Sequence, residues 1–289
     1  MADLVEIAGA GLSAVINPFG AELTHLRDAA GRELMTDADP AFWTGHAPLL
    51  FPIVGRLNGD VLRLDGAEYP MKQHGFARRR DFALVEHSAW HVRFRLEDDA
   101  ETRAVYPFAF ALDAAYAITG ATLTITITIT NRGDVAMPTS FGFHPAFAWP
   151  LPYGAPRDAH RIVFDADEPG TLVALVDGLA ARDDRPSPLD GRTLHLADAL
   201  FDDDALIWNG LASRRVAYGA QAGPQLDIAF PDTERLGIWS KPGSAFICIE
   251  PWHGIADPTG FSGDFRDKPG VFEIAPGGTR EIVMRITLS

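Results

Sequence analysis

The alternation of polar and apolar side chains predicts a protein built mainly of β-strands. The clearest case is Thr122–Thr130, where threonine alternates with leucine and isoleucine until the turn-forming cluster Asn131–Asp134. Because successive side chains of a strand point to opposite faces, this segment has one apolar and one polar face. Weaker runs of the same kind predict strands at Leu12–Ile16, Glu22–Arg27, His91–Leu96, Ala109–Ile118, Gln225–Phe230, Ala245–Glu250 and Glu281–Thr287.

Helices are expected to be few and short. No segment longer than about ten residues keeps the apolar spacing of a helix, and Leu196–Leu206 is short and acidic. Many short strands separated by turn residues are typical of an antiparallel sandwich or barrel. We therefore predict an all-β fold, a large antiparallel β-sandwich with few short helices.

The chain shows no internal boundary. Its 27 glycines and 21 prolines are spread along the sequence, and neither a linker nor a repeat divides it. We expect residues 1–289 to form a single domain. The stretch Pro150–Asp190 is rich in proline, glycine and aspartate, which predicts a run of long loops.

The charge balance narrows the possible partners. With 25 basic and 39 acidic residues the formal net charge is −14, which repels nucleic-acid phosphates and anionic membrane surfaces. No window approaches the roughly 18 apolar residues of a membrane span. We therefore expect a soluble cytoplasmic protein, a monomer or homodimer, with neither nucleic acid nor membrane as partner. The single cysteine, Cys248, lies in an apolar run and is interpreted as a small buried hydrophobe.

Four segments combine strand-like surroundings with side chains that perform acid, base or anion chemistry. Arg56 follows an apolar run, His74 precedes the cluster Arg78–Arg80, His144 lies among aromatic residues, and Glu250 ends an apolar strand. Each also has a purely structural explanation, such as a solvated arginine or a histidine satisfied by backbone groups. Glu250 is the most informative, because burying an unpaired carboxylate costs several kcal/mol.

In this order the four segments resemble the aldose 1-epimerase superfamily, and more closely the branch typified by LacX and the hexose-6-phosphate epimerases. The resemblance implies a galactose mutarotase-like supersandwich and an isomerase that interconverts the α and β anomers of an aldohexose or hexose 6-phosphate. The matching patterns are ADPAFW (Ala38–Trp43), FPIVGR (Phe51–Arg56), HGFAR (His74–Arg78), GFHPAF (Gly142–Phe147), LFDDDALIW (Leu200–Trp208), LGIWSKPG (Leu236–Gly243) and IEPWHG (Ile249–Gly254).

Anomer interconversion needs both a base and an acid, because ring opening removes the proton of the C1 hydroxyl and delivers a proton to the ring oxygen. The resemblance implies that Glu250 is the base and His144 the acid, while His74 and Arg56 hold substrate oxygens. A carboxylate and an imidazole together work near neutral pH. Neither a cofactor nor a metal is therefore expected.

Further substrate contacts are predicted less directly. By resemblance to the galactose-specific branch, Asp204 in the acidic stretch Asp202–Asp204 is a candidate sugar ligand. An aromatic ring is expected to stack on the sugar. Trp239 and Trp252 are the preferred candidates among four tryptophans near the motifs, the others being Trp43 and Trp208.

The expected partner is a small-molecule sugar or sugar phosphate. HGFAR departs from the pattern of the galactose-specific branch, and Arg78 offers bidentate donors to a phosphate on C6. Other basic residues considered for such a phosphate are Lys72, Arg79, Arg80, Arg266 and Lys268.

Two other classes of protein remain open. A non-catalytic carbohydrate-binding sandwich uses the same fold and aromatic residues, but it has no need for His144 and Glu250 together. A catalytic zinc set of His74, His144 and Glu250 has suitable residue types. It lacks the close spacing of common zinc motifs.

Overall fold

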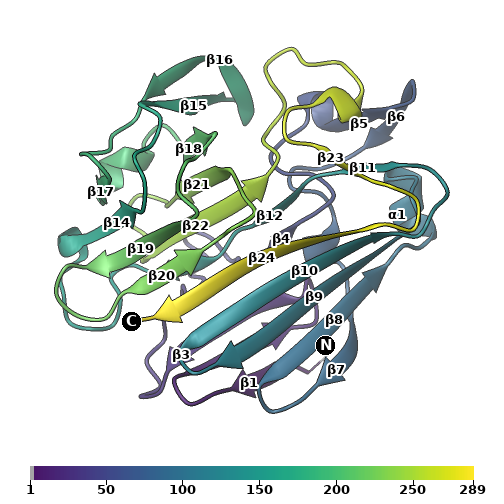
Figure 1. The fold of residues 1–289 in the computed structure, drawn as a ribbon. Coiled ribbons are helices and arrows are strands. Elements are labelled where there is room, and N and C mark those ends of the chain that lie inside the picture. Colours follow the sequence, from purple (N-terminus) through teal and green to yellow (C-terminus); the bar gives the residue numbers. More distant parts are fainter. Residues whose placement is uncertain (1–2) are drawn as a thin grey trace.

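The computed structural model describes residues 3–289, and antiparallel strands account for most of their regular structure (Figure 1). Within that range the single α-helix is α1 (Ala100–Val105), and no helix is long and apolar enough to cross a membrane. This confirms the all-β prediction. The remaining helical turns are of 3₁₀ type, namely η1 (Asn58–Asp60), η2 (Ala77–Arg79), η3 (Arg157–Ala159), η4 (Asp198–Phe201) and η5 (Phe265–Asp267).

The larger of the two main sheets joins distant parts of the chain. Its C-terminal strand β24 (Thr279–Leu288) pairs with β10 (Thr122–Asn131) on one side and β20 (Leu226–Ala229) on the other, as Figure 1 shows. The other strands continue the sheet outward from this centre. The full order is β17 (Thr193–His195), β14 (His160–Phe164), β19 (Arg215–Ala220), β20, β24, β10, β9 (Phe110–Thr119), β8 (His91–Glu97) and β7 (Ala83–His87).

The second main sheet contains three of the predicted site residues, Trp239, Glu250 and Trp252. Its order is β16 (Leu179–Pro186), β15 (Thr171–Val176), β18 (Leu206–Asn209), β21 (Arg235–Trp239), β22 (Phe246–His253), β12 (Phe141–Phe143) and β4 (Leu49–Leu50), with β13 (Ala146–Ala148) also paired to β22. Three smaller sheets complete the fold. They are β1 (Val5–Ala8) with β2 (Leu12–Asn17) and β3 (Glu22–Asp28), β5 (Val61–Leu64) with β6 (Ala67–Pro70), and β11 (Met137–Thr139) with β23 (Phe272–Ile274).

Alternating side chains form the core between the sheets. On β10 every second residue is buried, and Ile125 and Ile127 belong to the same apolar cluster as Ile247 and Ile249 of β22. Each such side chain contributes about 1.5–3 kcal/mol when it leaves water. The intervening residues of β22 project from the other face of that strand, so β22 separates the core from a second buried environment.

All eight strands predicted from periodicity are present, with ends that differ by at most a few residues. The prediction of long loops over Pro150–Asp190 was wrong, because this stretch contains β14, β15 and β16. Asp177 and Gly178 form the two-residue turn between β15 and β16, with φ values of 53° and 78°. This is a tight hairpin turn that Asp-Gly favours. β15 is an almost continuous apolar run and the centre of β16 is charged, so neither strand shows a clean polar–apolar alternation.

The core position of β10 can be tested by truncation. Ile127→Ala removes a fully buried side chain and is expected to lower the free energy of unfolding by about 2–5 kcal/mol. Its neighbour Thr126 lies on the opposite, half-buried face, so Thr126→Ala is expected to cost no more than about 1 kcal/mol. Urea unfolding followed by tryptophan fluorescence measures both. Equal losses in the two variants would contradict the assigned orientation of the strand.

Candidate active site

A cavity of about 320 Å³ opens on the face of β22 that points away from the core. It is lined by residues of both the second sheet and the loops before β5 and after β6. Seven of the eight side chains singled out from the sequence line this one cavity: Glu250, His144, His74, Arg78, Asp204, Trp239 and Trp252.

Strand register places His144 opposite Glu250. Gly142 pairs with Trp252 and Ala146 pairs with Cys248. His144 lies midway between Gly142 and Ala146, and Glu250 lies midway between Trp252 and Cys248. His144 and Glu250 therefore face each other across the ladder. This stretch lies between β12 and β13, where Pro145 interrupts the regular strand. The sequence motif GFHPAF thus positions an imidazole beside the carboxylate of a neighbouring strand.

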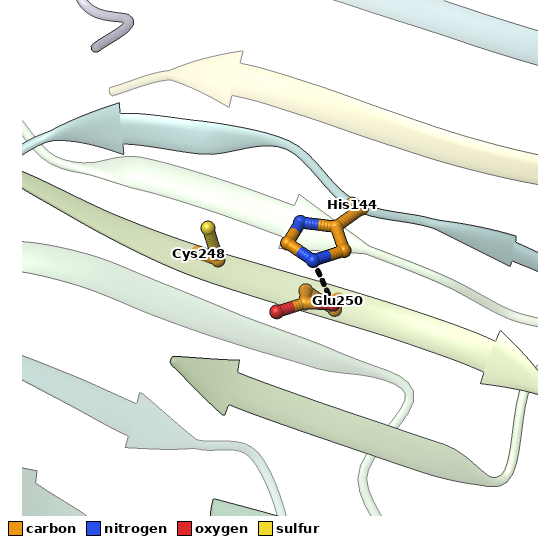
Figure 2. Close-up of side chains that lie close together, drawn as sticks. All are labelled: His144, Cys248 and Glu250. Atoms are coloured by element: carbon orange, nitrogen blue, oxygen red, sulfur yellow. Dashed lines mark ion pairs between the residues drawn. The ribbon is translucent and has the colours of Figure 1, made fainter. Parts of the chain in front are cut away.

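The Glu250–His144 pair is the most unusual electrostatic feature of the cavity. His144 Nε2 lies 3.1 Å from Glu250 Oε2, and both side chains are almost completely buried (Figure 2). Burial, reinforced by the negative charge of Asp204, raises the pKa of Glu250 well above its usual value. Burial lowers the pKa of His144 to about 3. Both pKa shifts favour the uncharged forms of the side chains. Together, the Glu250 carboxyl and the basic nitrogen of His144 therefore hold one titratable proton over a wide pH range.

His74 is a hydrogen-bond donor toward the cavity. The backbone N–H of Gly55 donates to His74 Nδ1 at 3.1 Å, so this nitrogen is unprotonated and Nε2 carries the hydrogen. Burial and the positive charges nearby hold the pKa of His74 well below its usual value. The ring lies 5.8 Å from that of His144, between centroids. A neutral imidazole with a fixed tautomer is suited to hold a substrate oxygen.

Arg78 and Asp204 supply opposite charges at the cavity surface. Arg78 Nη2 donates to the carbonyl of Gln73 at 2.9 Å, and its buried Nε has no hydrogen-bond partner among residues 3–289. Asp204 has a positive φ of 72°, and its Oδ1 accepts from the N–H of Ala205 at 2.7 Å. Both side chains keep polar atoms available for sugar hydroxyls.

Aromatic rings form the apolar part of the cavity. Trp43 lies against the His144 ring, with a centroid distance of 5.0 Å, and meets Trp239 edge to face. Trp252 lies across its strand neighbours Gly142 and Gly237, where an added Cβ would come within 2.6 Å of the indole in each case. Glycine at both positions therefore makes room for the Trp252 ring.

The comparisons with known proteins agree with this site. The sequence model of the family described as aldose 1-epimerase matches residues 3–259. The chain belongs to the aldose 1-epimerase family. Membership supports a sugar epimerase function, an isomerase-type reaction, with a small-molecule sugar as ligand.

Relatives within the aldose 1-epimerase family cover nearly the whole chain. The plasmid-encoded LacX protein of Lactococcus lactis subsp. lactis is 31% identical, over 98% of this chain and 99% of its own. A galactose mutarotase related enzyme from Lactobacillus acidophilus superposes with a TM-score of 0.93 at 32% identity, over 99% of this chain and 97% of its own. A galactose mutarotase-like protein from Lactobacillus casei gives 0.91 at 29% identity, over 99% and 100%. These matches confirm the predicted superfamily, its LacX-like branch and the mutarotase-like sandwich.

Of the eight predicted site residues, Arg56 is the one that does not line the cavity. Its guanidinium instead binds both carboxylate oxygens of Asp60, at 2.9 and 3.2 Å. The third contact is a 3.2 Å hydrogen bond from Nη1 to the carbonyl of Asp177. Because Asp60 lies four residues away, the side chain is directed along its own loop toward the β15–β16 hairpin.

Several lining residues were missed from the sequence. Gln73 precedes the HGFAR motif but carried no distinguishing pattern of its own, whereas Trp43, one of the less preferred tryptophan candidates, does line the cavity. Leu175 and Gly178 belong to the hairpin that was taken for a loop. The Asp-Gly pair between Val176 and Leu179 was the available signal for that hairpin. Trp208 is fully buried in the core and lies outside the cavity lining.

A buried ion pair supports the loops around the cavity. Lys268 Nζ lies 3.2 Å from Asp257 Oδ1, and neither side chain has appreciable exposure. Asp257 also accepts the N–H of Asn58 through Oδ2 at 2.8 Å, and its carbonyl accepts the N–H of Ala180 at 2.9 Å. The pair therefore links the loop of the FPIVGR motif to β16, at the edge of the cavity.

The contact between Arg56 and the hairpin leads to a testable distinction. Arg56→Ala removes the donor to Asp177, so amide hydrogen exchange in residues 171–186 is expected to quicken while the core strands stay protected. Arg63→Ala, which breaks the surface pair with Glu68, is the matched control and should leave the hairpin unchanged. If Arg56→Ala raises KM without altering exchange, Arg56 acts on the sugar directly, as the family resemblance implied.

Proposed function

We propose that this protein interconverts the α and β anomers of an aldohexose, with Glu250 as the base and His144 as the acid. One observation supports this most directly: a buried carboxylate and a buried imidazole lie 3.1 Å apart at the surface of a sugar-sized cavity. Burying this pair costs free energy that an apolar pair would not. A role in proton transfer accounts for its presence.

The reaction needs two proton transfers and no net change in composition. Glu250 takes the proton of the C1 hydroxyl as the C1–O1 bond becomes a carbonyl. The bond from C1 to the ring oxygen breaks, its electron pair stays on that oxygen, and His144 delivers a proton there. Rotation about C1–C2 presents the other face of the aldehyde, and the same steps in reverse close the ring.

A shared proton makes the two roles compatible with the pKa shifts. The pair with one proton exists either as neutral acid and neutral imidazole or as carboxylate and imidazolium. The two groups lie 3.1 Å apart, and rotation of the side chains into hydrogen-bond alignment allows a single transfer to interconvert the two forms. The carboxylate form has the protonation that ring opening requires. His74, as a neutral donor, stabilises negative charge that develops on a substrate oxygen.

The charges of the cavity favour an unphosphorylated sugar. Among residues 3–289, Arg78 is the only lysine or arginine that lines the cavity. Two carboxylic acids, Asp204 and Glu250, line it as well. The other basic candidates are directed elsewhere. Lys72, Arg79 and Arg80 line a separate groove, Lys268 is paired with Asp257, and Arg266 is bound by Asp65, Asp264 and Glu273.

Removing the proposed base tests the function. Glu250→Gln keeps the shape of the side chain but cannot accept the C1 proton, so the catalysed kcat/KM is expected to fall on the order of 10²–10⁴-fold. The rate is followed by polarimetry of freshly dissolved α-glucose and α-galactose, and by saturation-transfer NMR for glucose 6-phosphate, after subtraction of the uncatalysed rate. The free hexoses are expected to respond more strongly than the phosphate.

Glu281→Gln, which alters an exposed carboxylate, is the matched control and should retain full activity. If wild type accelerates no sugar, or if Glu250→Gln equals wild type, the catalytic assignment is wrong. Sugar binding without acceleration would then favour a non-catalytic carbohydrate-binding sandwich. A preference for glucose 6-phosphate would overturn the argument from cavity charge alone.

The pH dependence should report the shared proton of the pair. Because burial lowers the pKa of His144 to about 3, addition of a second proton is disfavoured, and most activity at pH 7 should persist at pH 5. On the alkaline side, activity falls as the pair loses its proton. The charge of Asp204 raises the pKa of Glu250, so Asp204→Asn should move this alkaline limb of kcat/KM to lower pH. An unmoved limb would show that Asp204 does not influence Glu250.

A further inference from the structure

Cys248 is a buried group beside the proposed catalytic pair that the reaction does not use. Its thiol, an imidazole nitrogen of His144 and a carboxylate oxygen of Glu250 all lie within 4.8 Å of one another (Figure 2). Interpreting Cys248 as a small buried hydrophobe explains its burial, which is complete. That interpretation does not explain why the thiol lies beside an imidazole and a carboxyl group.

Strand geometry brings the three donors together, with His144 in the two-residue break between β12 and β13. Cys248 and Glu250 are two residues apart on β22 and so project from the same face. His144 lies opposite Glu250 through the register of its neighbours. In Figure 2 the thiol lies to the left of the imidazole ring and the carboxyl lies below it. Donor atoms bound to one tetrahedral ion lie closer together than 4.8 Å, so the three side chains must turn inward to hold an ion.

Two atoms of this group lack hydrogen-bond partners. Glu250 Oε2 and His144 Nδ1 are buried, and neither makes a hydrogen bond with any residue from 3 to 289. The 3.1 Å approach of His144 Nε2 to Oε2 is an ion-pair contact without hydrogen-bond alignment. Buried polar atoms normally find a partner. These atoms are therefore available to a ligand that enters from the cavity.

The donor types select the kind of ligand. One sulfur, one nitrogen and one oxygen match the ligands of zinc, which are held at about 2.3 Å for sulfur and about 2.0–2.2 Å for nitrogen and oxygen. Hard cations such as Mg²⁺ prefer oxygen donors throughout. Three protein ligands leave a fourth position for water. Of the three, His144 and Glu250 line the cavity, whereas Cys248 is fully buried outside its lining.

We propose that His144, Cys248 and Glu250 form an inhibitory site for Zn²⁺. The bound ion uses the carboxylate and imidazole that the proposed function assigns to proton transfer, so metal and sugar exclude each other. Zinc binding itself stands on the geometry, whereas the inhibition rests on the proposed function. The ion acts as a competitor of the sugar and not as a cofactor.

Direct titration with Zn²⁺ tests the binding without any assay of activity. Competition with a chromophoric chelator is expected to show one site in wild type, and Cys248→Ala should weaken it at least about 10–100-fold. Cys248→Ser guards against a packing defect, since it keeps the size of the side chain. His25→Gln removes a half-exposed imidazole next to Glu33 and should leave the affinity unchanged. Co²⁺ substitution should give a thiolate-to-cobalt charge-transfer band that both cysteine variants lack.

Anomer interconversion then tests the competition. Zn²⁺ should raise the apparent KM of wild type linearly with the free Zn²⁺ concentration, while Cys248→Ala keeps its zinc-free rate and resists inhibition. Equal zinc affinity in wild type and both cysteine variants would overturn the proposed site. Zinc binding that depends on Cys248 but leaves catalysis unaffected would overturn the exclusion. If wild type catalyses no anomer interconversion, the titration still decides the metal site separately from the function.

Discussion

The structure depends on how β22 divides its side chains between two buried environments. Ile247 and Ile249 pack into the core with β10, while Cys248 and Glu250 project from the opposite face. The apolar face stabilises the strand sufficiently to hold a carboxylate where water is scarce. Glu250 is tolerated there because burial raises its pKa and favours the uncharged carboxyl, and because the imidazole of His144 lies 3.1 Å away across the ladder. The proposed proton transfer uses this costly pair.

The surroundings of the pair turn this arrangement into a binding site. Gly142 and Gly237 leave the space that Trp252 occupies, so an aromatic surface lies beside the carboxyl on the same strand. The hydrogen bond from Gly55 fixes the tautomer of His74. Preorganised groups of this kind need no reorganisation when charge develops on a substrate. An apolar surface with few oriented polar groups also suits the two faces of a hexose.

The cover of the cavity is held by charged contacts from distant parts of the sequence. Arg56 donates a hydrogen bond to the carbonyl of Asp177 in the turn of the β15–β16 hairpin. In β16, the N–H of Ala180 donates to the carbonyl of Asp257. Asp257 is in turn paired with Lys268. The FPIVGR motif therefore contributes to the architecture around the sugar cavity. That explains how a motif arginine can adjoin the site without lining it.

The sequence by itself determined the fold class and the eight most regular strands, because alternation is a local signal. Its ordered motifs also singled out His144 and Glu250, the pair to which we assign proton transfer. It did not reveal the β15–β16 hairpin, because the apolar run of β15 and the charged centre of β16 show no period-two alternation. Tertiary structure alone decided that Arg56 turns to Asp60 and that Trp43 joins the cavity. It also decided that Cys248 lies beside His144. Such contacts are set by strand register and loop packing, which link residues far apart in the chain and leave no periodic pattern in the sequence.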